Sequence, residues 1–220
     1  MIIAISAKQG AGKTTTADAL AAAIKSEDSH PRRVRFAAAL YEMHDAIRPV
    51  LTKYGIERPA IDAPLLQILG TEYGRNIIGE NVWVDCLMHF INNDLNIVVD
   101  LDEDIPAYII DDMRFKNEFA AFDKFKDLPN FPILRVRLEC DRDIRKARRG
   151  DKWRDNETHA SEVDLDGYVT EGKFDLIVDT GVTPINEVVD QILVAMQTKI
   201  NKQAINDALG EDDDNSTVSE

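Results

Sequence analysis

Short apolar stretches alternate with segments of helical hydrophobic spacing along the whole chain. This alternation is typical of an α/β protein in which helices connect parallel strands. We therefore predict an α/β fold with a central, mainly parallel sheet of about five strands. The stretches predicted as strands are 1–6, 34–36, 107–112, 133–138 and 175–178.

Helices are predicted in the intervening segments. The clearest is 185–209, in which apolar residues recur at helical spacing. The others are 13–25, 40–54, 65–69, 83–93 and 141–149. The stretch 96–106 fits neither pattern, because two valines are followed by four acids within five residues. An extra strand and an inserted loop both stay open for it.

Size and charge limit the organisation of the chain. A length of 220 residues suits one domain, and we predict a single domain over 1–209. The end of the chain, 210–220, begins with a run of acids and is predicted to be a disordered tail. The net charge of −14 argues against nucleic-acid binding, because a nucleic-acid footprint needs a basic surface.

The sequence also lacks the signs of a membrane or secreted protein. No apolar run is long enough to span a bilayer, and no leader pattern opens the chain. We expect a soluble cytoplasmic protein, in the host cytoplasm if the protein is viral, with no membrane partner. Cys86 and Cys140 lie far apart without zinc or disulfide spacing. We expect both to be small buried apolar side chains.

A phosphate-binding loop follows the first predicted strand. The segment Ala7 to Thr14 (AKQGAGKT) matches the Walker A pattern, with alanine as its first residue, and leads into a predicted helix. Its two glycines allow close approach of the backbone to phosphate oxygens. Lys13 supplies charge to the β- and γ-phosphates, and the Thr14 hydroxyl can bind Mg²⁺. The predicted ATP-binding residues are Lys8, Gly10, Ala11, Gly12, Lys13, Thr14 and Thr15.

Two acids end the predicted strand 107–112, as in a Walker B segment. Because successive strand residues point to opposite faces, one of Asp111 and Asp112 should face the nucleotide, and which one stays open. We assign Mg²⁺ to Thr14 and Asp112. Arg114 follows closely, and its guanidinium suits a phosphate. Helix capping is the alternative role for acids at a strand end.

A basic segment follows the strand 133–138. Arg142, Arg145 and Arg149 share one face of the predicted helix, and Gly150 and the polar residues after it suggest a mobile flap. We therefore predict a lid over about 141–162, with Arg145 and Arg149 acting on the transferring phosphate together with Lys13 and Arg114. A solvated helix face paired with nearby acids is the alternative.

Four stretches resemble the deoxynucleoside monophosphate kinases of tailed bacteriophages, a branch of the P-loop kinases. They are the phosphate loop, 36–40, 66–75 with 81–84, and 110–118, and a weaker match lies at 159–162 (HASE). The resemblance implies a three-layer P-loop NTPase fold with helical nucleotide-binding and lid segments. It also implies transfer of the γ-phosphoryl group of ATP to a deoxynucleoside monophosphate (dNMP), with Mg²⁺, in support of the nucleotide supply for DNA synthesis.

The same resemblance implies residues for the acceptor. Arg75 and Arg114 become candidates for its phosphate, and Phe36 and Trp83 for walls against its base or sugar. Glu118 is a further candidate for binding the acceptor. A Phe or Trp at such spacing is more often core packing, so that alternative stays open. Homodimer formation stays open as well.

Two rival functions share the phosphate loop. One is another small-molecule kinase, acting on a coenzyme precursor or a mevalonate phosphate, and the block 66–71 (LQILGT) argues against it. The other is a P-loop ATPase or switch module whose output is a binding event. The guanine-reading N-K-x-D motif is missing, since 201–204 reads NKQA.

Overall fold

The computed structural model describes residues 1–25, 30–100, 105–126, 128 and 131–213. The chain separates into two compact units. The first unit comprises residues 1–33 and 104–220, and the second comprises 34–103. Within the described residues, no helix is both long and apolar enough to cross a membrane.

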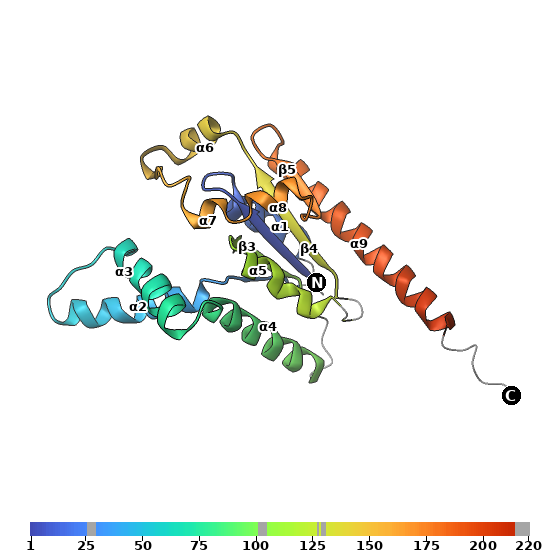
Figure 1. Ribbon diagram of the computed structural model, residues 1–220, viewed down its shortest axis with the longest axis horizontal. Coiled ribbons are helices and arrows are strands. Elements are labelled where there is room, and N and C mark those ends of the chain that lie inside the picture. Colours follow the sequence, from blue (N-terminus) through green and yellow to red (C-terminus); the bar gives the residue numbers. More distant parts are fainter. Residues whose placement is uncertain (26–29, 101–104, 127, 129–130, 214–220) are drawn as a thin grey trace. The chain divides into compact units, whose positions relative to one another are not determined.

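A five-stranded sheet forms the centre of the first unit, with the strand order β2-β3-β1-β4-β5 (Figure 1). β1 pairs in parallel with β3 and with β4, and β4 pairs in parallel with β5. The prediction of an α/β fold with about five mainly parallel strands is therefore confirmed. The strands are β1 (Ile2–Ala7), β2 (Arg32–Val34), β3 (Tyr108–Met113), β4 (Ile133–Glu139) and β5 (Leu176–Asp179).

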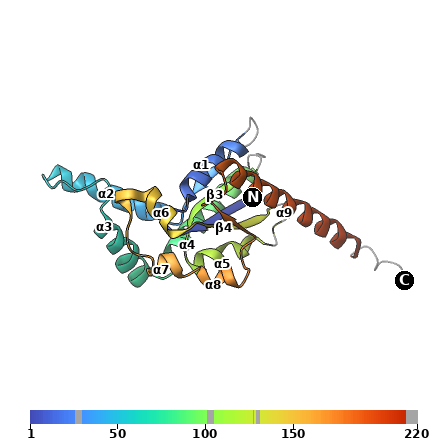
Figure 2. The same ribbon diagram turned by 90° about the horizontal axis from the view of Figure 1, so that it is seen from above.

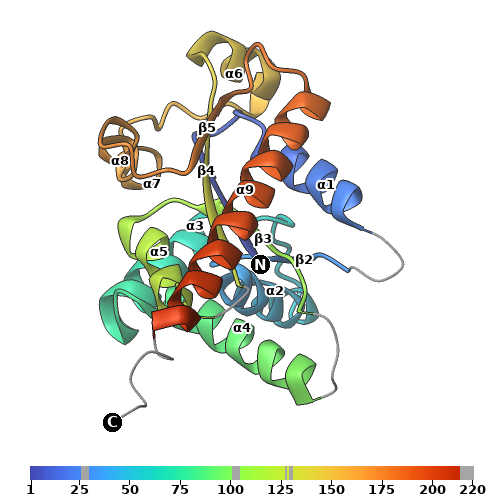
Figure 3. The same cartoon turned by 90° about the vertical axis from the view of Figure 1, so that its right-hand side faces the viewer.

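The central strand β1 is buried along its whole length. A strand covered on both faces needs a nearly continuous apolar run, which the first residues of the chain supply. Two helices, α1 (Lys13–Ile24) and α9 (Ile185–Asp213), pack together on one face of the sheet (Figures 2 and 3). The core on this face includes Ile3, Leu20 and Ile192, each fully buried.

Shorter helices lie on the opposite face, where α5 (Lys116–Ala121) and α8 (Asp166–Thr170) cover β4 (Figure 2). The Arg135 guanidinium stacks on the Phe119 ring, 4.6 Å from its centroid, and the Phe119 and Tyr168 rings meet edge to face at 5.0 Å. The remaining elements of this unit are η2 (Phe122–Phe125), α6 (Arg142–Arg149), η3 (Gly150–Lys152) and α7 (Ala160–Val163).

The second unit is helical. Its elements are α2 (Ala38–Lys53), α3 (Ala63–Gln67), the π-helix η1 (Ile68–Ile78) and α4 (Val82–Asp100). The predicted helix 65–69 thus lies partly in α3 and continues into a π-helix. β2 ends at Val34, two residues earlier than predicted, so Phe36 lies outside the strand.

The segment 96–106, for which we predicted a strand or a loop, begins as helix. α4 continues through it to Asp100, because Leu87, Ile91 and Val98 bury one side of the helix at helical spacing. Residues 101–104 lie outside the described residues. Cys86, expected to be buried, is exposed on the other side of α4.

The C-terminal helix is also longer than predicted. α9 reaches Asp213, so that the first residues of the predicted disordered tail, 210–213, are helical. Residues 214–220 lie outside the described residues. Cys140, the other cysteine, is half-buried and carries a free thiol.

Candidate functional site

The predicted phosphate loop lies between the end of β1 and the start of α1. Gly10 and Gly12 have φ angles of 78° and 96°, a left-handed conformation that is strained for any residue with a Cβ. Gly12 is the N-cap of α1, and it offers no side chain to that helix end. The first backbone N–H groups of α1 are therefore positioned for an anion. Thr14 and Thr15, in this turn, are exposed.

Lys13 is held in the loop itself. Its ammonium donates to the carbonyl oxygen of Ala7. Burial lowers the pKa of Lys13 to about 7. Neighbouring charges modify this pKa further, in decreasing order Arg114 (lowering), Glu162 (raising), Arg137 (lowering) and Asp111 (raising). A phosphate brought next to Lys13 would favour its charged form and raise the pKa again.

The two acids at the end of β3 are not related by simple strand alternation. Ala4 of β1 pairs with Ile110, but Ser6 pairs with Met113, so β3 carries one extra residue here. Such a bulge redirects side chains. Strand alternation alone therefore does not assign Asp111 and Asp112 to opposite faces.

Asp111 forms an ion pair with Arg33 of β2. Its buried carboxylate accepts from Arg33 Nη2 at 2.6 Å, and Arg33 Nη1 pairs with Asp18 of α1. Asp111 is also among the charges that raise the pKa of Lys13. Asp112 is half-buried. The structure thus links Asp111 to the phosphate-loop lysine and gives it a charged partner.

The oxygen donors near the loop suit Mg²⁺. This cation prefers oxygen ligands and keeps several waters. The exposed hydroxyl of Thr14 and the carboxylate of Asp112 are donors of that type. Within the described part of the chain, no group of three or more His, Cys, Asp or Glu residues is arranged to hold a metal. With Thr14 and Asp112 as its protein ligands, a Mg²⁺ ion would keep its other positions for nucleotide phosphates and water, as this cation usually does.

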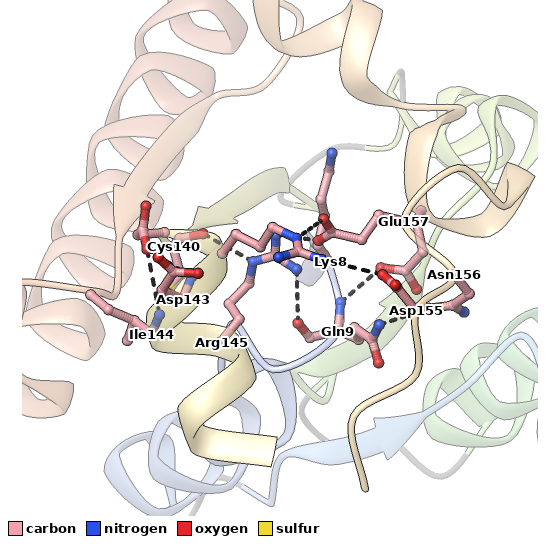
Figure 4. Close-up of polar contacts among 12 residues, drawn as sticks. Lys8, Gln9, Cys140, Asp143, Ile144, Arg145, Asp155, Asn156 and Glu157 are labelled. Carbon is pink, nitrogen blue, oxygen red and sulfur yellow. Dashed lines mark hydrogen bonds and ion pairs between the residues drawn. The ribbon is translucent and has the colours of Figure 1, made fainter. Parts of the chain in front are cut away.

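The predicted lid helix α6 packs directly against the phosphate loop (Figure 4). A Cβ placed on Gly10 would lie 2.8 Å from the carbonyl oxygen of Arg145 and 3.0 Å from Cγ of Arg149. The structure therefore brings Arg145 and Arg149 to the loop, as the charge pattern suggested.

Arg145 is occupied by protein groups. It is buried, and donates to the Cys140 carbonyl at 3.0 Å and to the Gln9 carbonyl at 3.3 Å. Its Nη2 also pairs with Glu157 at 2.5 Å, and Arg142 pairs with the same carboxylate at 2.7 Å (Figure 4). Burial raises the pKa of Glu157, but hydrogen bonds from the two arginines leave it below the usual range.

Arg149 differs from Arg145. It is exposed, and its Nη2 donates to the carbonyl oxygen of Lys152 at 3.2 Å. The predicted alternative of an ion-paired helix face thus describes Arg142 and Arg145, although their partner is Glu157 rather than an acid of the helix. Arg149 is the predicted lid arginine with the more accessible guanidinium.

Gln9 connects the phosphate loop to the segment predicted as a lid. Its Nε2 donates to Asn156 Oδ1 at 2.7 Å (Figure 4). The same Nε2 donates to the Arg154 carbonyl, and the Gln9 backbone N–H donates to Glu162 Oε2 at 2.8 Å. Sequence reasoning missed Gln9, because it occupies a variable position of the Walker A pattern. No local signal marks partners so distant in sequence.

Arg114 contacts Glu162, the carboxylate that also accepts from the backbone N–H of Gln9. Its Nη1 donates to Glu162 Oε1 at 2.5 Å and to the Ser161 carbonyl at 3.4 Å. Glu118, predicted to bind the acceptor, is buried and caps α5. Its Oε2 accepts from the backbone N–H groups of Arg114 at 2.6 Å and of Phe115 at 3.1 Å.

A second carboxylate from the same region also reaches the loop. Asp166, at the start of α8, pairs with Lys8 at 2.8 Å and with Arg137 at 2.9 Å. Arg137 is buried and also donates to the Ser6 hydroxyl at 3.3 Å. Lys8, predicted to bind ATP, therefore has a carboxylate partner. Sequence reasoning gave Arg137 no role.

The predicted acceptor residues Phe36, Arg75 and Trp83 lie in the second unit. Phe36 is 2% exposed and Trp83 is 4% exposed. The Trp83 indole donates to the Gly70 carbonyl at 3.0 Å, and a Cβ on Gly74 would overlap its ring. This is the core packing that the sequence left open for these two aromatic residues. Arg75 is half-buried on η1.

A hollow of about 560 Å³ lies on the second unit where η1 meets α4. It follows Arg75 in the sequence and surrounds the start of the helix that carries Trp83. The lining is mixed, with Glu80, Asp85 and His89 among its polar members.

No protein-family model and no curated protein sequence matches the chain. Solved structures with a similar backbone include a gluconokinase from Sinorhizobium meliloti 1021, at 15% identity and a TM-score of 0.49 over 93% of this chain and 95% of that one. A tunicamycin resistance protein from Deinococcus radiodurans aligns at 16% identity and a TM-score of 0.47, over 88% and 93%. At this level of similarity, the substrates of those proteins do not indicate a substrate for this chain.

Proposed function

We propose that the protein is an ATP-dependent kinase that phosphorylates a deoxynucleoside 5′-monophosphate, giving the diphosphate and ADP. The observation that supports phosphoryl transfer is the phosphate loop itself, with its two left-handed glycines, its half-buried lysine and the basic helix packed on it. The support for a nucleotide acceptor is the resemblance of 66–84 and 110–118 to phage dNMP kinases.

Phosphoryl transfer needs alignment and positive charge more than covalent chemistry, because its transition state is loose. Lys13 would neutralise charge on the β- and γ-phosphates, with the backbone N–H groups of α1 around them. Arg149 would reach the transferring group from α6. When bound through Thr14 and Asp112, Mg²⁺ would supply further charge neutralisation between the phosphates.

The acceptor would enter as an anionic phosphate. One of its oxygens would form a bond to the γ-phosphorus while the bond to the β–γ bridging oxygen breaks and ADP leaves. An anionic oxygen needs no general base to remove a proton. Arg114, beside the loop, is our candidate for holding that phosphate, and Arg75 of the second unit is the other.

The test is release of ADP from ATP and Mg²⁺ with a panel of acceptors. The panel contains dAMP, dCMP, dGMP, dTMP, the four ribonucleotides, dephospho-coenzyme A and phosphomevalonate, with Lys13→Ala as the control. We expect at least one dNMP to raise ADP release well above the acceptor-free rate, and the control to abolish this. Turnover only with a non-nucleotide acceptor would replace the substrate class, and ATP binding without any acceptor-dependent turnover would favour a switch or ATPase module.

A further inference from the structure

Glu162 joins two parts of the site that are far apart in sequence. Its carboxylate is buried, and both oxygens are used. Oε2 accepts from the backbone N–H of Gln9 in the phosphate loop at 2.8 Å, and Oε1 accepts from Arg114 Nη1, beyond the end of β3, at 2.5 Å. A single carboxylate therefore fixes Arg114 relative to the loop.

A buried carboxylate is unfavourable unless charged or polar partners compensate for the lost hydration. Glu162 has both kinds, a backbone donor and a guanidinium. Since each partner occupies a different oxygen, moving either one disturbs the other. The charge-assisted bond to Arg114 is of the stronger class.

Asp166 offers a comparison within the same segment. It lies four residues after Glu162, and its two partners are Lys8 and Arg137. Asp166 therefore attaches this segment to the loop through Lys8 and to β4 through Arg137. If Glu162 only anchored this segment to the rest of the site, replacing Glu162 and replacing Asp166 would have the same kind of effect.

We propose that Glu162 is a positioning residue for phosphoryl transfer, which holds Arg114 beside the phosphate loop so that the guanidinium meets the phosphate groups in the reaction. This inference rests on the proposed function. Arg114 is the group that would touch substrate, and Glu162 acts through it. Misplacing such a group by about 1 Å costs on the order of 100-fold in rate.

Glu162→Gln is the sharpest substitution. A glutamine keeps the size of the side chain but has only one acceptor oxygen, and its amide donor would face another donor. We expect kcat to fall by about 10- to 100-fold, with the KM for ATP changed by less than about 3-fold, because the loop backbone still binds the nucleotide. Glu162→Asp should recover part of kcat, since it restores the charge at shorter reach.

A double-mutant cycle separates positioning from anchoring. The proteins are wild type, Glu162→Gln, Arg114→Ala and the double variant, with Asp166→Asn alone and combined with Arg114→Ala as the matched control. We expect Glu162→Gln to cause no further loss of kcat once Arg114 is removed, whereas the loss from Asp166→Asn persists. Equal and additive losses from both carboxylates would overturn the proposal and leave Glu162 as an anchor of α7.

A second readout keeps this test separate from the choice of acceptor. The same cycle is measured on binding of ADP with Mg²⁺ and aluminium fluoride, which mimics the transferring phosphoryl group and needs no turnover. Coupling between Glu162 and Arg114 there, with no acceptor turned over, would sustain the positioning role and reject the dNMP substrate. Turnover with a dNMP but additive effects in both measurements would reject the positioning role and keep the kinase.

Discussion

Gly10 and Arg145 approach so closely that a Cβ on the glycine would lie 2.8 Å from the arginine's carbonyl oxygen. The contact is with backbone, which cannot swing away as a side chain can. Gly10 thus meets two requirements at once, a φ angle of 78° and room for α6. The phosphate loop and α6 are therefore in direct contact at this point.

Gly10→Ala should therefore be more damaging than Gly12→Ala. Both alanines would take a left-handed conformation, at about 1–2 kcal/mol each. Gly12, however, has nothing within 4 Å of an added Cβ, so only Gly10→Ala must also displace α6. We expect the lower melting temperature for Gly10→Ala, measured by thermal unfolding without nucleotide. Equal melting temperatures for the two variants would mean that α6 does not rest on Gly10 in solution.

Nucleotide binding should take up a proton at pH 8. Burial lowers the pKa of Lys13 to about 7, so the unliganded lysine is mostly neutral at that pH, and phosphates raise the pKa again. Calorimetry of ATP binding in buffers of different ionisation enthalpy measures the uptake. We expect up to about one proton at pH 8 and little from this group at pH 6, where Lys13 is already charged.

Lys13→Met is the control for that experiment, because it removes the titrating group and should remove the buffer dependence at pH 8. Identical enthalpies of ATP binding in all buffers at pH 8 for the wild type would contradict a neutral lysine.

The lowered pKa of Lys13 also has a consequence for folding. The folded value lies below the ordinary 10.5, so the unfolded chain binds more protons between the two, and the contribution of Lys13 to stability rises with pH across that window.

Local patterns in the sequence sufficed for the sheet and the phosphate loop. The buried run of β1 and the glycine-rich turn into α1 are encoded by neighbouring residues, so spacing alone predicts them. The contacts of Glu162 with Gln9 and Arg114 could not be predicted, since partners so distant in sequence leave no periodic signal. The bulge in β3 was not predicted for the same reason, because it depends on the pairing of β3 with β1.

Burial was the other quantity that the sequence could not supply. Phe36 and Trp83 had two open interpretations, and only the packing of the second unit shows how little of each side chain is exposed. The π-helix η1 was missed because its residues carry no periodicity distinct from that of an ordinary helix.

Asp111 and Asp112 should give different defects. Asp111→Asn removes the buried charge that pairs with Arg33, and we expect a loss of stability on the order of 2 kcal/mol in urea unfolding. Asp112→Asn removes our predicted Mg²⁺ ligand, and we expect it to raise the Mg²⁺ concentration needed for half-maximal turnover by about 10-fold. The reverse assignment, with the Mg²⁺ defect in Asp111→Asn, would make Asp111 the metal ligand.

Replacement of the two α6 arginines, Arg145 and Arg149, should likewise give different defects. Arg145 is buried among the Cys140 and Gln9 carbonyls and Glu157, so we expect Arg145→Ala chiefly to lower the melting temperature. Arg149 is exposed on the same helix, and we expect Arg149→Ala to lower kcat by about 10- to 1,000-fold while unfolding is nearly unchanged, because an arginine that meets transferring phosphate acts mainly in the transition state. Lys146, exposed on α6 as well, is the matched control, and its replacement by alanine should change neither quantity. If Lys146→Ala and Arg149→Ala lower kcat equally, the helix contributes general positive charge rather than a specific arginine.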